Sequence, residues 1–324
     1  MDRGVLYFVA GSKHCVHAIV SIASLRKHYS GPIAICTEAD GPGRECAEWI
    51  AKDDALNIPG GPVLVIPDKK LAAGSRGKSY FCKTIVPRLS PFEQTLYLDA
   101  DTLIVGDLNP LWPDPSTGEV VLTQFADWIS TGSRMQQRIK PWAELCEDEE
   151  TGRVIYTPDA QQLRRVQVQL SKSWPAINTG VMAWSKTSEP FCDEWNRVTS
   201  MRNVFIVDET ACQIIFPEYP HRVMDDRFNA SVVFPRTGQQ VATRTDIRAL
   251  HGHGFKFWKR ADGWNLYRSS LMEALAQNRA NIQSMRVGDK FLTAGYMQNG
   301  VGVQVMSDED RKLLRSYWGE RQAA

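Results

Sequence analysis

The chain has 324 residues, of which 43% are hydrophobic and 23% charged, and these ordinary globular values exclude widespread disorder and a collagen-like fibre. Lys and Arg number 38 against 37 Asp and Glu, so the net charge of +1 gives no overall electrostatic attraction to nucleic acid. Every apolar run is much shorter than the roughly 20 residues that span a bilayer, and the sequence predicts neither a transmembrane segment nor a signal peptide.

In the first third of the chain, apolar strand segments alternate with amphipathic helical segments. Strands are predicted at 5–10, 32–36, 63–66 and 95–98, with helices between them at 14–29, 43–56 and 78–89. This alternating order predicts an α/β fold, in which a mostly parallel sheet carries helices on both faces. Ligands of such sheets bind beyond the carboxyl ends of the strands, so the residues that follow each strand are candidates for a site.

The rest of the chain is less regular. Further strands are predicted at 120–125, 177–184 and 247–250, and helices at 159–172, 189–201 and 208–216. A polar, loop-rich insertion covers 127–172. Beyond residue 260 the pattern predicts a helix at 264–285, a hairpin at 290–306 and an amphipathic helix at 308–318. The expected organisation is a main domain over 1–260 and a mostly helical C-terminal extension over 261–324.

The number and spacing of the cysteines indicate the redox environment of the protein. There are seven, at positions 15, 36, 46, 82, 146, 192 and 212. They are scattered, they form no Cys-x-x-Cys pair, and most lie inside apolar segments. This pattern favours buried thiols over a disulfide framework or a zinc site, and it predicts a reducing, cytoplasmic location.

The sharpest local signal is an acidic turn after the fourth strand. Leu96-Tyr97-Leu98 runs directly into Asp99-Ala100-Asp101-Thr102, so two carboxylates two residues apart can face one pocket. Hard oxygen ligands suit Mg²⁺ or Mn²⁺. A solvated Asp-rich turn is the structural alternative. Two known groups of enzymes use such a turn: haloacid-dehalogenase-type phosphatases, in which Asp99 would be the nucleophile, and nucleotide-diphospho-sugar glycosyltransferases of the GT-A type, in which both acids would clamp a metal.

Three more stretches, in the same order and at similar intervals, resemble glycosyltransferase family 8, the group that contains glycogenin and bacterial galactosyltransferases. They are Ser79-Tyr80-Phe81-Cys82-Lys83, then Ile177-Asn178-Thr179-Gly180-Val181 followed by Asp208-Glu209, and finally His251-Gly252-His253-Gly254-Phe255-Lys256. The resemblance covers about residues 4–260. It departs from the family in a shorter spacing to Lys256, in Phe257 where proline is usual, and in Glu209 where glutamine is frequent. The phosphatase alternative fits less well, because its nucleophile is expected near the start of the domain and several predicted elements precede Asp99.

The resemblance implies a GT-A, Rossmann-like fold and a metal-dependent transfer of sugar, with retention, from a nucleotide diphosphate donor such as a UDP-sugar to an acceptor hydroxyl. It implies that Asp99, Asp101 and His251 hold Mn²⁺ or Mg²⁺. It assigns Asp208, Asn178 and Lys83 to the donor sugar and the reacting face. The residues it implies for donor binding are Val9, Ala10, Gly11, Lys83, Ala100, Gly254 and Lys256.

Several alternatives stay open from the sequence. Asp208 can also act as the N-cap of the helix that begins after it, and His253 can contact phosphate or serve as a ligand. A protein that binds a sugar nucleotide without transferring the sugar is a further hypothesis. The insertion mixes tryptophans with basic residues, which suits an acceptor glycan or an exposed DNA base. A lipid or a protein as the acceptor is also open. The acidic run over 144–150 argues mildly against DNA. No feature of the sequence marks an oligomeric state.

Overall fold

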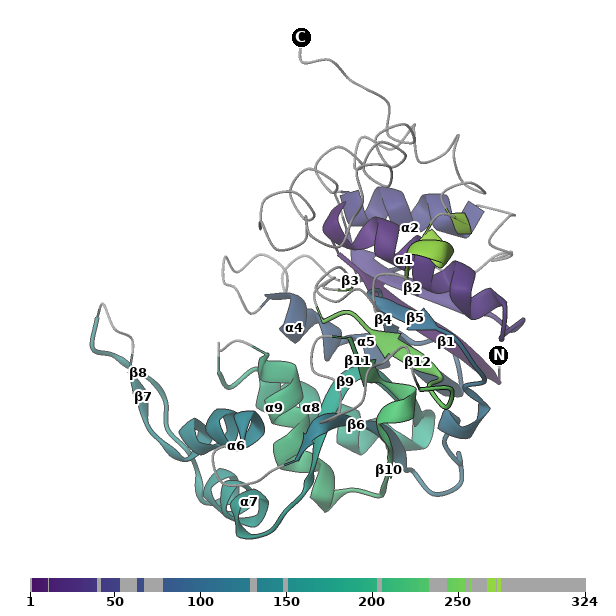
Figure 1. Cartoon of the computed structure of the whole chain (residues 1–324). Helices are drawn as coiled ribbons and strands as arrows, with labels where there is room; N and C mark the ends of the chain where they lie inside the picture. Colours follow the sequence, from purple (N-terminus) through teal and green to yellow (C-terminus); the bar gives the residue numbers. More distant parts are fainter. Residues whose placement is uncertain are drawn as a thin grey trace. The chain divides into compact units, whose positions relative to one another are not determined.

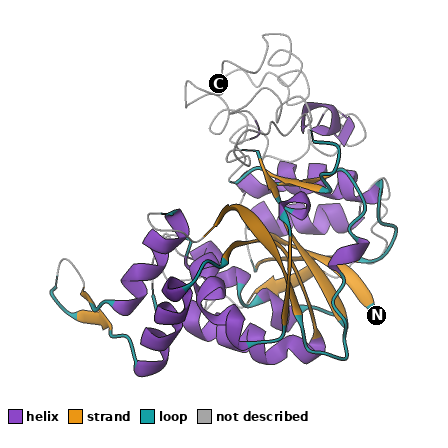
Figure 2. Cartoon of the chain, turned by 60° about the horizontal axis from the view of Figure 1, so that its bottom comes forward, coloured by secondary structure: helices purple, strands orange, loops and turns teal. Residues whose placement is uncertain are grey.

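A seven-stranded sheet organises the structure, which is a computed structural model of the whole chain (Figure 1). Its strand order is β10 (His221–Met224), β6 (Val120–Trp128), β9 (Pro175–Ser185), β4 (Gln94–Asp99), β1 (Arg3–Val9), β2 (Ile33–Glu38) and β3 (Val63–Ile66). β1 pairs with β2 and β10 with β6 in parallel, whereas β9 runs antiparallel to β6. The predicted α/β class, a mostly parallel sheet flanked by helices, is confirmed (Figure 2).

The chain divides into two compact units. Unit 1 comprises Met1–Gly4, Ile66–Tyr97 and Asn109–Asn229, and unit 2 comprises Val5–Val65, Leu98–Leu108 and Ala230–Ala324. Within these ranges the structure describes residues 2–10, 12–39, 42–52, 63–66, 78–128, 133–147, 151–202, 206–232, 244–253, 257, 267–271 and 273–274.

Unit 2 is built on β1, which the sequence makes apolar almost throughout. The six residues from Gly4 to Val9 are all buried, as in a parallel strand that is covered on both faces. Two helices of this unit, α1 (Ser12–Arg26) and α2 (Pro42–Lys52), pack against each other. Ile19 and Ile22 of α1 are fully buried, and a buried side chain of this size contributes roughly 1.5–3 kcal/mol.

A small second sheet of unit 2 follows the acidic turn. Its strands are β11 (Ala230–Ser231), β12 (Ala249–His251) and β5 (Thr102–Ile104). β12 pairs antiparallel with β5, and β11 pairs parallel with β12. The strand predicted at 247–250 is β12, moved so that it ends on His251, while β5 and β11 were not predicted. Strands of two or three residues are too short to show an alternating pattern.

Unit 1 is built around β9, whose residues from Ala176 to Ser185 are all buried. Its helices after this strand are α8 (Glu189–Thr199) and α9 (Val207–Ile215), which pack against each other, and α9 also packs on β9 (Figure 1). Trp195 of α8 is buried and its indole stacks on Phe191. β10, between Pro220 and Asp225, was not predicted, because its four residues are all only partly buried and their pattern is weak.

The helix predicted over 78–89 is two helices. These are α4 (Lys78–Lys83) and α5 (Val86–Leu89), with Pro87 in the first turn of α5. Proline has no N–H to donate and crowds the preceding turn, so it suits a helix start better than a helix interior. Between the helices, the N–H groups of Thr84 and Ile85 donate to carbonyls three residues earlier, which tightens the chain into a turn.

The insertion over 127–172 is more regular than predicted. It contains α6 (Arg134–Ile139), a 3-10 turn (Lys140–Ala143), a hairpin of β7 (Cys146–Glu147) and β8 (Val154–Tyr156), and α7 (Ala160–Ser171). The expected helix at 159–172 is α7, and Asp159 caps it by accepting from the N–H of Gln162. Figures 1 and 2 show the hairpin standing away from the other described elements of unit 1.

The C-terminal extension is described only in part. Residues 267–271 and 273–274 are helical and lie within the predicted helix at 264–285. The predicted hairpin at 290–306 and the helix at 308–318 lie outside the described residues. In the described part of the chain, none of the helices has both the length and the apolar character that a membrane crossing requires.

The cysteines that the structure describes are free thiols. Cys36, Cys82, Cys192 and Cys212 are buried, and Cys146 is partly buried. Burial raises the pKa of the Cys192 and Cys212 thiols, because the thiolate would lose its hydration. Such thiols are poor nucleophiles, which agrees with the predicted structural role.

Candidate active site

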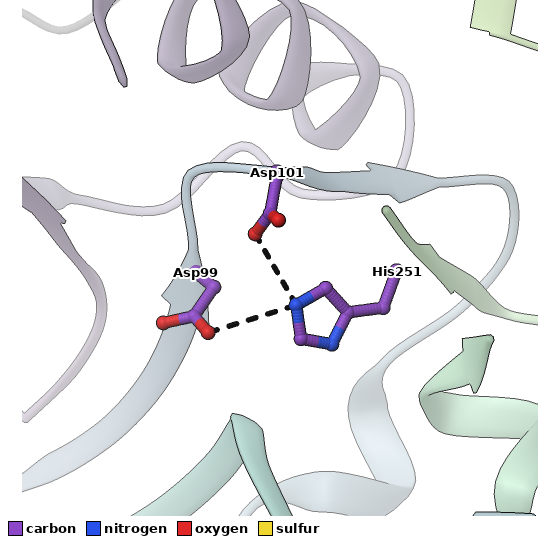
Figure 3. Close-up of side chains that lie close together, drawn as sticks. All are labelled: Asp99, Asp101 and His251. Atoms are coloured by element: carbon purple, nitrogen blue, oxygen red, sulfur yellow. Dashed lines mark ion pairs between the residues drawn. The ribbon is translucent and has the colours of Figure 1, made fainter. Parts of the chain in front are cut away.

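Two carboxylates and one imidazole meet beyond the carboxyl end of β4. Nε2 of His251 lies 3.2 Å from Oδ1 of Asp101 and 3.6 Å from Oδ2 of Asp99. Figure 3 shows this ring nitrogen pointing at both acids. The His251 and Asp101 side chains are only 4% and 9% exposed, whereas that of Asp99 is 24% exposed. The structure thus brings together the three residues to which the family resemblance assigned the metal.

Strand pairing explains how His251 reaches an acidic turn 150 residues earlier in the chain. In the ladder between β12 and β5, His251 lies opposite Thr102. The next residue, Gly252, donates its N–H to the carbonyl of Asp101 at 2.8 Å. A side chain at Gly252 would have its Cβ 2.6 Å from the Phe257 ring, so only glycine allows this close approach.

A chain of buried hydroxyl groups also holds the acidic turn in place. The Thr102 hydroxyl donates to the carbonyl of Asp99 at 2.8 Å and lies 2.9 Å from the hydroxyl of Ser21. The Ser21 hydroxyl is in turn 3.1 Å from that of Tyr7, and burial raises the pKa of Tyr7, so its phenol stays protonated. This buried chain of hydrogen bonds ties the turn to α1 and β1 and limits the positions that Asp99 can take.

The donor set fits a divalent cation. The ligand atoms of Asp99, Asp101 and His251 all lie within 4.8 Å of one another, close enough to share one ion. The two carboxylates suit Mn²⁺ or Mg²⁺, the imidazole adds a nitrogen ligand, and a cation held by all three would offset the repulsion between the two carboxylates. The three residues therefore fit the divalent cation that the resemblance implied.

In unit 1, Lys83 and Asp208 form a buried ion pair. Nζ of Lys83, at the end of α4, is 3.6 Å from Oδ2 of Asp208, and the two side chains are 8% and 2% exposed. The same carboxylate oxygen accepts from the Thr179 hydroxyl at 2.7 Å. The ammonium group also lies over the ring of Tyr97, 5.0 Å from its centroid. Each charge is thus compensated by the other, as a buried charge requires.

Asn178 lies in a second hydrogen-bonded chain of the same unit. Its amide nitrogen donates to Oε1 of Glu209 at 2.6 Å, and its carbonyl accepts from the backbone N–H of Gly180 and from Asn229. The other oxygen of Glu209 accepts from Nη1 of Arg138 at 2.9 Å, which brings a residue of α6 to this cluster. Hydrogen bonds at both its nitrogen and its oxygen therefore fix the orientation of the Asn178 amide.

Asp208 is not the N-cap of α9. The helix begins at Val207, the residue before it is Ile206 in a left-handed conformation, and no side chain caps the helix. Asp208 lies in the first helical turn, where a negative charge is favoured by the helix dipole, and its carboxylate faces Thr179 and Lys83. The negative charge of Asp208 adds to burial in raising the pKa of Cys212 on the same helix.

The structure describes only some of the residues assigned to the nucleotide. Val9 ends β1, is fully buried and pairs with Thr37 of β2. Ala10 is half-buried, and Ala100, between the two acids, is buried. The other three, Gly11, Gly254 and Lys256, lie outside the described residues.

Sequence reasoning did not single out three residues of these clusters. Thr179 stood within a quoted motif but had no role, Glu209 was noted only as a departure, and Arg138 is one of several basic residues of the insertion, to which no individual role was given. No local pattern could have revealed these contacts, since they join residues 29 to 71 positions apart.

Comparisons with known proteins complete the picture of the fold. No family model matches the sequence, and no curated protein matches it. Among solved structures, the chain is similar to the bifunctional glycosyltransferase WbbM in its apo form, with a TM-score of 0.56 and 14% identity over 85% of this chain and 51% of that one. It is also similar to the galactosyltransferase LgtC in complex with donor and acceptor sugar analogues, with a TM-score of 0.51 and 13% identity over 84% of this chain and 94% of that one. The chain has the GT-A glycosyltransferase fold.

An active-site mutant of LgtC matches equally well, with a TM-score of 0.53 and 13% identity over 84% of this chain and 95% of that one. The chain thus spans about half of WbbM and nearly all of LgtC. At this level of identity the likeness concerns the fold, because one fold hosts many activities. These neighbours do not favour the phosphatase or the DNA-base alternative.

Proposed function

We propose that this protein is a metal-dependent glycosyltransferase that moves a hexose from a nucleotide diphosphate donor, a UDP-sugar, to an acceptor hydroxyl with retention of anomeric configuration. The observation that carries the proposal is the convergence of Asp99, Asp101 and His251 at the carboxyl end of β4 in a chain with the GT-A fold. Ligands of open α/β sheets bind at this edge. The buried free thiols favour a reducing compartment, the cytoplasm.

In this proposal Asp99, Asp101 and His251 hold Mn²⁺ or Mg²⁺. The bound ion supplies positive charge to the diphosphate leaving group, which becomes more negative as the bond to the sugar breaks. The backbone of Val9, Ala10 and Gly11 seats the base and ribose at the end of β1. In the same assignment Ala100 lies near the ribose, and Gly254 and Lys256 contact the diphosphate.

Asp208, Asn178 and Lys83 are assigned to the donor sugar and the reacting face. Lys83 and Asp208 offer opposite charges for hydrogen bonds to sugar hydroxyls or a phosphate oxygen, and their mutual ion pair holds both in place. Asn178 is oriented by Glu209 and Asn229. A sugar site built in this way depends on fixed donors and acceptors more than on apolar contact.

The direct test is UDP binding measured by calorimetry with Mn²⁺ and with EDTA. We expect binding that depends on Mn²⁺, followed by slow hydrolysis of a UDP-sugar when no acceptor is present. UDP binding of equal strength in EDTA would contradict the cation site. If UDP does not bind in either condition, the UDP-sugar donor is ruled out.

The insertion over 127–172 is proposed to bind the acceptor. In the described residues, five of the six exposed large apolar side chains lie within it: Leu145, Val154, Ile155, Leu163 and Val168. Exposed apolar side chains gathered on one segment mark an interaction site more often than isolated ones do. Acceptor glycans, lipids and proteins all present apolar faces that such a surface can cover.

Replacing Val154 and Ile155 with serine should raise the KM for the acceptor by at least about 30-fold, since each large apolar contact contributes roughly 1–2 kcal/mol and about 1.4 kcal/mol is a factor of ten. Both side chains are about half exposed, so the free energy of unfolding should change by less than about 0.5 kcal/mol. The acceptor is the one found in a screen of oligosaccharides, glycolipids and DNA. Val105→Ser, an exposed apolar position outside the insertion, is the matched control. An unchanged KM in the double variant would contradict an acceptor role of the hairpin.

A further inference from the structure

Two residues of the described chain hold a backbone conformation that L-amino acids avoid. Apart from glycine, positive φ occurs there only at Ile206 (56°) and His253 (46°). Each lies two residues from a candidate site residue, Ile206 before Asp208 and His253 after His251. A side chain with a Cβ is crowded by the backbone at such angles, and residues of this kind persist where the surroundings hold them, often at functional sites.

The strained turn at His253 places two imidazoles against each other. The ring centroids of His251 and His253 are 4.0 Å apart, and the ring planes are tilted by 30°. An extended or helical backbone at this residue would carry the side chain in another direction, because φ sets where Cβ points relative to the preceding strand. The left-handed turn therefore accounts for the contact between the rings.

The turn itself is fixed on its other side. Gly252 bonds to the carbonyl of Asp101, and the Phe257 ring fills the space beside Gly252. Phe257 stacks on Tyr267 with centroids 4.3 Å apart, and the Tyr267 hydroxyl lies 2.6 Å from Nδ1 of His17 on α1. Because this buried packing holds the backbone, the His253 side chain has little freedom to leave His251.

We propose that His253 is a positioning residue, whose ring closes one face of the His251 imidazole and holds it in the plane in which Nε2 faces Asp99 and Asp101. The inference rests on the proposed cation site and adds a residue to it. His251 can rotate about its side-chain bonds, and a ligand that must be oriented at the moment of binding binds more weakly. Residues that orient metal ligands without touching the metal typically change affinity by about 10- to 100-fold.

The test compares three variants by Mn²⁺ affinity, measured by electron paramagnetic resonance, and by the Tm of the metal-free protein. His253→Gly removes both the ring and the strain, so we expect Mn²⁺ to bind about tenfold more weakly while the Tm rises by about 2 °C. His253→Asn, which also tolerates the left-handed region, should weaken binding to a similar degree. His253→Phe keeps a flat ring and should stay within about threefold of the wild-type affinity.

The outcomes separate the inference from the proposed function. Unchanged Mn²⁺ affinity in His253→Gly, whatever its Tm, would overturn the positioning role, and so would a loss in His253→Phe as large as that in His253→Gly. If the wild-type protein does not bind Mn²⁺, the cation site itself fails, and the inference with it. Ile206→Gly is the matched control, because it relieves the same kind of strain at the start of α9 and should leave Mn²⁺ affinity unchanged.

Discussion

Asp101→Asn should weaken Mn²⁺ binding by at least about 100-fold. Mutating a residue that only orients a metal ligand already lowers metal affinity by about 10- to 100-fold, and Asp101 is proposed to be a ligand itself. The variant keeps the shape of the side chain but replaces a charged oxygen ligand with a neutral amide. The backbone carbonyl of residue 101 still accepts from Gly252, so the turn should keep its fold. In calorimetry, UDP should bind this variant in Mn²⁺ only as weakly as it binds the wild type in EDTA.

Asp114→Asn is the control for this experiment. Asp114 is an exposed acid in a turn, where hydrogen bonds from Ser116 lower the pKa of its carboxyl group. It carries the same charge as Asp101 and lies outside the cation site, so its loss should leave both Mn²⁺ and UDP affinity unchanged. Full Mn²⁺-dependent UDP binding by Asp101→Asn would show that the acidic turn does not hold the cation.

Lys83→Met is expected to lower the free energy of unfolding by about 3 kcal/mol, because it leaves the buried carboxylate of Asp208 without its positive partner. The double variant Lys83→Met with Asp208→Asn removes both charges. Its stability should return to within about 1 kcal/mol of the wild type, since no charge is then buried alone. Urea unfolding of the wild type, the two single variants and the double variant measures this coupling directly.

The same four proteins separate a structural role from a catalytic one. We expect transfer activity to fall by at least about 100-fold in both single variants and to stay low in the double variant. Recovery of activity together with stability would show that the ion pair only supports the fold. Lys27→Met is the matched control, because Lys27 pairs with Glu273 at an exposed position, where an ion pair contributes less than about 1 kcal/mol.

The insertion that is proposed to bind the acceptor is anchored within unit 1 by hydrogen bonds. Arg138 of α6 bonds to Glu209, and Glu209 bonds to Asn178, so the segment proposed to bind the acceptor is connected within unit 1 to the cluster proposed to bind the sugar. Tyr156 of the hairpin is held as well, with its hydroxyl donating to the carbonyl of Trp142 and Arg202 lying over its ring. The exposed Val154 and Ile155 are therefore displayed on an anchored hairpin.

Much of the fold was available from the sequence because it depends on local patterns. The apolar runs at 5–10 and 95–98 and the amphipathic segment at 14–29 predicted β1, β4 and α1 within a few residues. Such periodicity records which side chains face a core, wherever that core lies. The helix at 78–89 was wrong only at its break, where Thr84 and Ile85 form a tight turn before Pro87.

The acidic turn was also readable, since Asp99 and Asp101 follow an apolar strand directly. What the residues around it would do came from a resemblance, and not from any single local pattern. Sequence alone left open whether Asp208 caps a helix or faces a pocket. The sequence could not separate these two roles, because an aspartate at the start of a helix is equally suited to capping the helix and to binding a ligand.

Tertiary structure decided which distant residues meet. Pairing between β12 and β5 brings His251 to Asp99 and Asp101, and the packing of α4 near α9 brings Lys83 to Asp208. Contacts of this kind depend on strand register and helix packing over more than 100 residues, which no local window contains. The left-handed turn at His253 also depends on tertiary structure. A positive φ is sterically unfavourable for histidine, so the surrounding packing must hold it.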